Sequence, residues 1–71
     1  MSEPLFWDAT YALAVALKRK HPLIDLEAVS LRQVYLYVIA LPDFNDDPEL
    51  ANDTILSEIY RIWYEELIHD N

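Results

Sequence analysis

The chain has 71 residues with a formal net charge of −8, and 54% of them are hydrophobic, while glycine and cysteine are absent. This apolar content suits one small folded domain rather than a disordered segment, and the lack of cysteine excludes disulfides, thiol catalysis and thiolate-bound zinc or iron–sulfur clusters. The acidic balance disfavours nucleic acids and anionic membranes, whose binding depends on lysine and arginine, and favours a basic protein surface or cations.

The first predicted helix runs from about residue 8 to residue 20. Asp8 is placed to cap its N-terminus, and Trp7, directly ahead of that cap, could pack as a hydrophobic staple. Pro22 ends the helical pattern, because proline moves the preceding residue, His21, out of the α region. We interpret His21 as a turn residue without a catalytic role. The last turn holds the basic residues that the helix dipole favours there: Lys18, Arg19 and Lys20.

The second predicted helix runs from about residue 31 to residue 41, with Ser30 as its cap and Pro42 after its end. In the linker before it, Asp25 could start a short helical turn and Val29 could pair in a brief strand. The apolar residues of the helix recur at spacings of three and one, which lie on one face: Leu31, Val34, Tyr35, Val38 and Leu41.

The third predicted helix runs from about residue 48 to residue 68. Asp47 suits the N-cap and Pro48 the first helical position, where no amide donor is needed. We expect Trp63 to pack in the core. The helix carries a broad apolar face formed by Ile55, Leu56, Ile59, Tyr60, Ile62, Trp63 and Leu67. These patterns predict a mainly all-α, three-helix domain over residues 1–71, ordered from about residue 6 to residue 68.

Two further patterns bear on where the protein works. The longest apolar runs, residues 11–17 and 34–41, fall short of the roughly 20 residues that cross a bilayer. The start of the chain, residues 1–4, lacks the basic residues and apolar core of a signal peptide. The sequence therefore predicts a cytoplasmic protein without a membrane partner.

The segment from residue 43 to residue 53 holds five carboxylates and no base: Asp43, Asp46, Asp47, Glu49 and Asp53. One interpretation is a solvated helix start, since the helix dipole favours each acid there by about 0.3–1 kcal/mol. A cap needs only one carboxylate, however, and Phe44 is placed to hold the loop against the core. The second interpretation is a docking site for a cationic partner or a divalent metal ion.

The metal chemistry open to this segment is limited. An EF-hand is excluded, because position six is Pro48 instead of glycine and position twelve is Thr54 instead of glutamate. Carboxylates without histidine or cysteine suit hard cations such as ferrous iron, which they would bind weakly with water completing the shell. Glu66 and His69 have the spacing of di-iron bundles, but those need two such pairs, so we interpret them as a solvated helix end, with a low-affinity cation site as the alternative. No nucleophile and base are paired, which indicates that the protein is not an enzyme.

The chain resembles the IscX-type proteins of iron–sulfur cluster assembly over about residues 6–66. The resemblance rests on Phe-x-Asp-Asp-Pro at residues 44–48, followed by Asn-Asp-x-Ile-Leu at residues 52–56 and by a later tryptophan, Trp63. Further matches are Trp7-Asp8, His21-Pro22 and the pair Glu65-Glu66.

The resemblance implies a small acidic helical domain with a modified winged-helix-like topology. It implies an adaptor without catalytic activity that regulates cluster assembly, binds a cysteine desulfurase of the IscS type where a frataxin-like protein also binds, and binds ferrous iron weakly. By position, the expected iron ligands are Asp43, Asp46, Asp47 and Asp53. The expected partner-binding residues are Asp43, Asp46, Asp47, Glu49, Asp53, Glu65 and Glu66.

Two other functions stay open at this point. One is a winged-helix DNA-binding module, which would need a basic recognition helix, whereas the third predicted helix carries only Arg61. The other is a small acidic interaction or dimerisation domain without an iron or desulfurase role. The docking hypothesis requires that the acids of residues 43–53 are neither buried nor neutralised within the chain.

Overall fold

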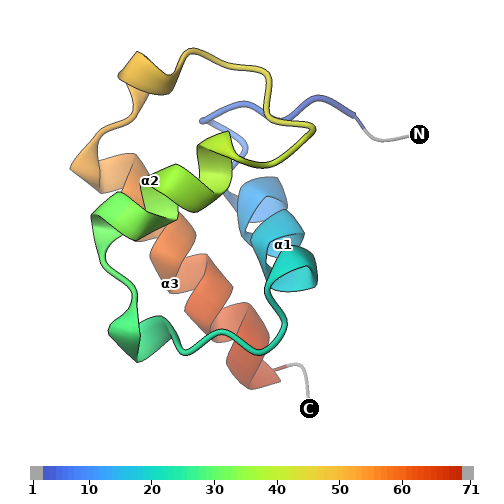
Figure 1. Cartoon of the computed structure of the whole chain (residues 1–71), viewed down its shortest axis with the longest axis vertical. Helices are drawn as coiled ribbons and strands as arrows, with labels where there is room; N and C mark the ends of the chain where they lie inside the picture. The colour runs from blue at the N-terminus through green and yellow to red at the C-terminus, as the bar shows by residue number, and fades with distance from the viewer. Residues whose placement is uncertain (1–2, 70–71) are drawn as a thin grey trace.

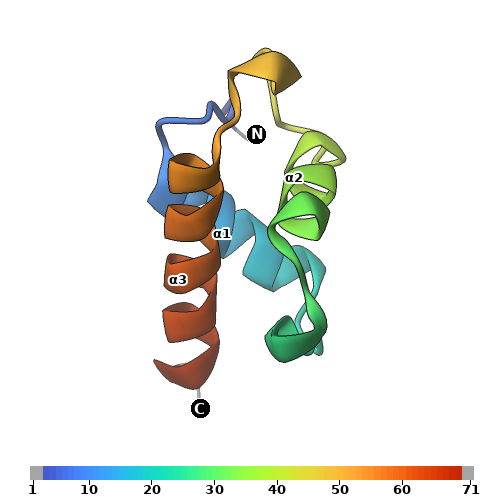
Figure 2. The ribbon, with the colours of Figure 1, turned by 90° about the vertical axis from the view of Figure 1, so that its left-hand side faces the viewer.

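The computed structural model describes residues 3–69, which form three α-helices: α1 (Thr10–Lys20), α2 (Leu31–Ile39) and α3 (Asp53–His69). One-turn 3₁₀ helices lie in both connections, η1 (Leu26–Ala28) before α2 and η2 (Pro48–Leu50) before α3. In Figure 1, α3 runs diagonally across the molecule, and Figure 2 shows it along one side, with α1 and α2 on the other side of it. The all-α, three-helix prediction is confirmed, while the winged-helix-like topology stays a prediction.

The core lies between the three helices, and α3 contacts α1 more extensively than it contacts α2. Trp63 is fully buried at the centre of the core, as the sequence predicts. Its ring packs edge to face against the ring of Tyr37, and the ring centroids are 6.0 Å apart. Burial of such apolar side chains is the main favourable term in folding. The buried residues are Trp7, Leu13, Ala14, Leu17, Leu26, Val34, Val38, Leu41, Leu56, Ile59 and Trp63.

Helix α2 begins where the sequence predicts. The Oγ of Ser30 accepts the backbone N–H of Gln33 at 3.2 Å, and Oε1 of Gln33 accepts the backbone N–H of Ser30 at 2.9 Å. This reciprocal capping box satisfies two amide groups that a helix start would leave without partners. The helix ends two residues earlier than predicted, at Ile39, and Leu41 closes a turn onto the carbonyl of Val38.

The predicted start of α1 is wrong. The cap position is Ala9, which makes no side-chain capping bond, and Asp8 lies exposed in the preceding turn. The backbone N–H of Ala9 donates to the carbonyl of Phe6 at 3.0 Å, so a turn brings the chain into the helix. The position of the chain before α1 is instead fixed by Trp7, which forms hydrogen bonds to Asp46 and Asp47 in the loop before α3. The basic last turn of α1 is confirmed.

The predicted start of α3 is also wrong. Asp47 and Pro48 do form a cap and a first helical position, but they start η2, which lasts one turn. Ala51 is extended, and Asn52 then caps α3 by accepting the backbone N–H of Ile55 on Oδ1 at 2.9 Å. Two short-range caps within six residues therefore divide the predicted helix into a turn and a helix.

In the linker before α2, the predicted helical turn at Asp25 is present, and the predicted strand at Val29 is not. Asp25 starts η1 by accepting the backbone N–H of Glu27 on Oδ1 at 3.1 Å. Val29 forms no strand, because its N–H closes η1 on the carbonyl of Leu26. Within residues 3–69 the one β-bridge joins Leu5 to Phe44. No helix in that range is long and apolar enough to span a membrane.

Candidate functional site

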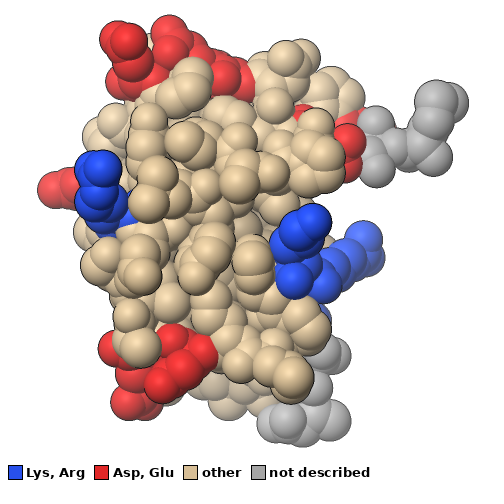
Figure 3. All heavy atoms as spheres, in the orientation of Figure 1, with Lys and Arg blue, Asp and Glu red and all other residues tan. Residues whose placement is uncertain are grey.

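The acidic corner, as we name residues 43–53 with their five carboxylates, lies at one end of the molecule. Figure 3 shows a group of acidic side chains at the top of the view, over the segment that holds η2 in Figure 1. The corner connects α2 to α3, so its backbone is fixed by those helices at its two ends.

Trp7 anchors the middle of the acidic corner to the core. Its backbone N–H donates to Oδ2 of Asp46 at 3.0 Å, and its indole N–H donates to the backbone carbonyl of Asp47 at 2.8 Å. The buried indole also stacks on Tyr35, with centroids 6.1 Å apart, and meets Phe44 edge to face at 4.9 Å. The half-buried Phe44 packs against the core, which confirms its predicted role in holding the loop.

Two of the five corner carboxylates accept hydrogen bonds from backbone N–H groups. Both oxygens of Asp46 accept backbone N–H groups, Oδ1 that of Asp47 at 2.7 Å and Oδ2 that of Trp7. Asp47 uses Oδ1 to accept the N–H of Glu49 at 2.9 Å. Charged acceptors form strong hydrogen bonds with amides, so these acids stabilise the loop. Sequence reasoning missed the role of Asp46, since its partner lies 39 positions away.

The other three carboxylates lie in two different places. Glu49 and Asp53 are exposed and line a groove with Arg32, between the start of α2 and the start of α3. Asp43 is half-buried and lines a separate groove along α1 with Glu3. The acidic corner is therefore not one cluster of carboxylates.

The corner acids form no ion pair in the described part of the chain, although Arg32 lines the groove that Glu49 and Asp53 share. Within residues 3–69, no ion pair joins Lys, Arg or His to Asp43, Asp46, Asp47, Glu49 or Asp53. In the same range, no group of three or more His, Asp or Glu side chains is arranged to hold a metal ion. The predicted iron ligands are thus acidic and in part exposed, but the fold does not gather them into a cage.

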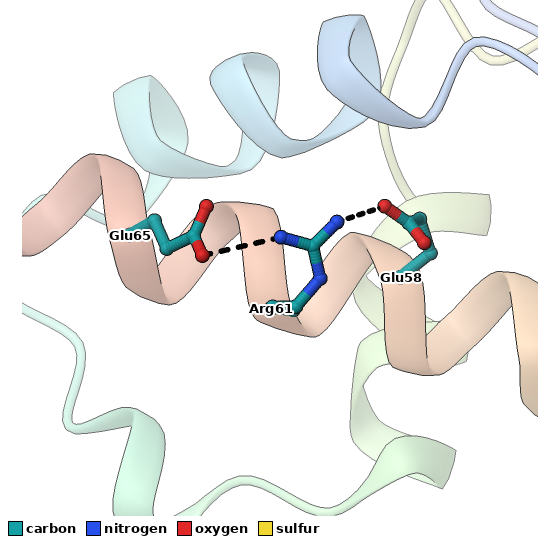
Figure 4. A network of polar contacts seen from close by, with 3 residues as sticks. All are labelled: Glu58, Arg61 and Glu65. Carbon is teal, nitrogen blue, oxygen red and sulfur yellow. Dashed lines mark hydrogen bonds and ion pairs between the residues drawn. The ribbon is translucent and has the colours of Figure 1, made fainter.

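Glu65 and Glu66 lie far from the corner, since Asp53 and Glu65 are about 18 Å apart along the axis of α3. Glu66 pairs with Lys18 of α1 at 3.5 Å. Glu65 pairs with Arg61 at 3.1 Å, and Arg61 also pairs with Glu58, as Figure 4 shows. The fold therefore separates these two predicted partner-binding residues from the other five.

The ion pairs of Arg61 decide the charge of the outer side of α3. The hydrogen bond that Arg61 donates to Glu58, the negative charge of Glu58 and that of Glu65 raise the pKa of the Arg61 guanidinium above its usual value. Arg61 is the one lysine or arginine in α3, and two glutamates flank it. The outer side of this helix consequently offers no excess positive charge.

Two comparisons with known proteins show what this chain is similar to. A family model described as iron–sulphur cluster assembly matches residues 5–67, from the segment that carries Trp7 through most of α3. An uncharacterized protein of Pseudomonas aeruginosa is 31% identical over 62 residues, which cover 87% of this chain and 94% of that protein.

Proposed function

This chain belongs to the iron–sulphur cluster assembly family, and on that premise we propose that it is an acidic adaptor that docks on a cysteine desulfurase of the IscS type. In this proposal the acidic corner binds a basic surface of the enzyme and competes there with a frataxin-like protein. The adaptor regulates cluster assembly and performs no chemical step itself.

The observation that carries the proposal is the pair of exposed carboxylates on Glu49 and Asp53 beside a loop that Trp7 anchors. A surface charge held by a fixed backbone can match a basic surface without first paying for the ordering of a loop. Complementary charges of this kind raise association rates, and salt screens them within about 8–10 Å. Docking should therefore weaken as the salt concentration rises.

Weak binding of ferrous iron belongs to the same proposal. Asp53 is exposed, and Asp47 uses one of its two oxygens in the cap of η2. Both are available as oxygen ligands, which ferrous iron accepts, and water would complete the coordination. The two oxygens of Asp46 already accept amides, so this residue is better suited to holding the loop than to binding iron.

The second function considered from the sequence, a DNA-binding module, finds little support. A recognition helix neutralises phosphates with lysine and arginine, and the one arginine of α3 is paired with Glu58 and Glu65. A basic protein surface is the better partner for this molecule.

The desulfurase contact can be tested with two matched variants, Glu49→Lys and Glu27→Lys. Both glutamates are exposed, lie in one-turn helices, and donate their backbone N–H to the aspartate two residues earlier. Their reversal changes the net charge equally. We expect Glu49→Lys to weaken binding to a desulfurase about tenfold or more in calorimetry and to reduce its salt dependence, while Glu27→Lys has a much smaller effect. Equal effects of the two variants would refute docking at the corner.

The iron proposal has its own measurement. Under anaerobic conditions, calorimetric titration with ferrous iron should show weak binding that Asp53→Asn reduces and the control variant Glu27→Gln leaves in place. Titration curves that are the same for Asp53→Asn and the unchanged protein would remove iron binding from this site, and would leave the desulfurase proposal standing.

A further inference from the structure

A second exposed surface lies at the end of the molecule opposite the acidic corner. Tyr64 and Ile68, one turn apart on α3, keep 41% and 51% of their surface exposed. They form a ridge between two hollows, because both side chains line each of them. One hollow is also lined by Tyr60, Arg61 and Glu65, and the other by Ile24, Asp25, Leu26, Glu27 and Leu67.

A hydrogen bond fixes the shape of this surface. The hydroxyl of Tyr60 donates to the backbone carbonyl of Leu26 at 2.7 Å, and the buried Leu26 side chain packs in the core. This bond ties η1 to α3, the two elements that border the hollow beside Leu67. The hollow between η1 and α3 is therefore built into the folded chain.

The border of the second hollow is acidic. Asp25 and Glu27 are exposed on η1, and within residues 3–69 neither forms an ion pair with lysine, arginine or histidine. Figure 3 shows a second group of acidic side chains at the bottom of the view, over the segment that holds η1 in Figure 1. Across the ridge, Glu65 shares one arginine with Glu58. The apolar ridge thus has negative charge, unpaired within the described residues, on the side of η1, and on its other side Arg61 lines the hollow together with Glu65.

We propose that this Tyr64–Ile68 surface binds a cationic amphipathic helix of a partner protein. An aromatic and an aliphatic anchor at the centre of a patch, with charge at its rim, is the arrangement of a protein-binding surface. Leucine-like side chains of the partner fill the two hollows, and its lysines or arginines face Asp25 and Glu27. An anionic membrane is disfavoured, because the same two acids would repel it.

This surface is separate from the acidic corner, since Asp53 and Ile68 are about 22 Å apart along the axis of α3. The proposal therefore goes beyond docking at the corner, and the two surfaces can be occupied together. An adaptor with both surfaces can hold two basic partners at once.

The test uses the full chain and two synthetic peptides with the same number of lysines. One is an amphipathic leucine–lysine helix, and the other replaces each leucine with serine. We expect the amphipathic peptide to bind more tightly in calorimetry and to shift the NMR signals of Tyr64, Ile68 and η1. Equal binding of the two peptides, or shifts confined to residues 43–53, would overturn the proposal, because both results indicate attraction by net charge alone.

Variants sharpen the assignment. Ile68→Ser should weaken the amphipathic peptide about tenfold, whereas Leu50→Ser, which removes a leucine that is 59% exposed on η2, should leave its affinity unchanged. Glu27→Lys should weaken binding of the amphipathic peptide, and Glu49→Lys should not. For the desulfurase we expect the opposite, with Glu49→Lys having the larger effect. Equal losses within either pair contradict the proposal. Analytical ultracentrifugation that finds a dimer broken by Ile68→Ser would assign the surface to a second copy instead, and would equally overturn it.

Discussion

The indole N–H of Trp7 donates a hydrogen bond of 2.8 Å to the backbone carbonyl of Asp47, 40 positions away along the chain. Together with the bond from the backbone N–H of Trp7 to Asp46, it joins the segment before α1 to the loop before α3. The carboxylates of this loop repel one another, so the loop needs such an anchor to present Glu49 in a fixed place. Trp7 is thus both a core residue and the support of the acidic corner.

Replacing Trp7 by phenylalanine tests the anchor. Trp7→Phe keeps an aromatic ring and removes the indole donor, which leaves the carbonyl of Asp47 without this partner. We expect the free energy of unfolding to fall by about 1–2 kcal/mol and amide hydrogen exchange at Glu49 to become faster. The control is Trp63→Phe, whose lost Nε1 has no hydrogen-bond partner in the described structure and which should leave exchange at the corner unchanged relative to global stability. Unchanged exchange in Trp7→Phe would show that ring packing and the backbone bond to Asp46 hold the loop without the indole donor.

The two roles of the corner acids can be separated by alanine. Asp46→Ala removes the acceptors of two backbone N–H groups, one of them partly buried, and should lower the free energy of unfolding by about 1–3 kcal/mol. Glu49→Ala should change it by no more than about 0.5 kcal/mol, because this side chain is exposed and makes no hydrogen bond or ion pair to residues 3–69. Urea denaturation measures both values. If Asp46→Ala proves neutral, Asp46 is as available for a partner as Glu49.

The capping of the first two helices gives a further pair of variants. Ser30→Ala removes the acceptor of the capping box and should cost about 1 kcal/mol of stability, within the usual range of about 0.5–2 kcal/mol for helix caps. Asp8→Ala should cost much less, because Asp8 makes no capping bond to α1. Thermal and urea unfolding of the two variants measure both losses of stability. An equal loss in Asp8→Ala would restore Asp8 as the cap of α1.

Two tyrosines one turn apart test the link between η1 and α3. Tyr60→Phe removes the donor to the carbonyl of Leu26 and should lower stability by about 0.5–1.5 kcal/mol. It should also speed amide exchange in η1. The exposed Tyr64 gives the matched control, since Tyr64→Phe removes a hydroxyl that makes no hydrogen bond to residues 3–69. Similar exchange in η1 for both variants would mean that packing of Leu26 alone holds this turn.

Helical periodicity was enough to predict which faces would be buried, because the side chains of one face lie three and four positions apart. Val34, Val38, Ile59 and Trp63 all lie where that spacing puts them. Helix starts were predicted well only where the cap and its partner are close in sequence, as at Ser30 and Asp25. At the start of α1 the chain is held by the contacts of Trp7 with Asp46 and Asp47, and the local sequence pattern wrongly indicated Asp8 as the cap.

The candidate site was predicted less completely, because it too depends on contacts between residues that are far apart in the sequence. The acids of residues 43–53 are visible in the sequence, and so is the family motif that contains them. The sequence did not separate Asp46, which accepts two amides, from Glu49, which is exposed. It also placed Glu65 in the same set as the corner acids, although α3 carries it to the other end of the molecule. The hollow between Tyr64 and η1 depends on η1 and α3 meeting, which no local pattern reports.

The sequence by itself determined the helical class, the excess of negative charge, the absence of thiol chemistry and the family, since all of these depend on composition, spacing and a local motif. The tertiary structure alone decided which carboxylates hold the fold and which face outward. That choice depends on hydrogen bonds between residues 39 and 40 positions apart, such as those of Trp7 with Asp46 and Asp47, and such partners meet only when the chain has folded.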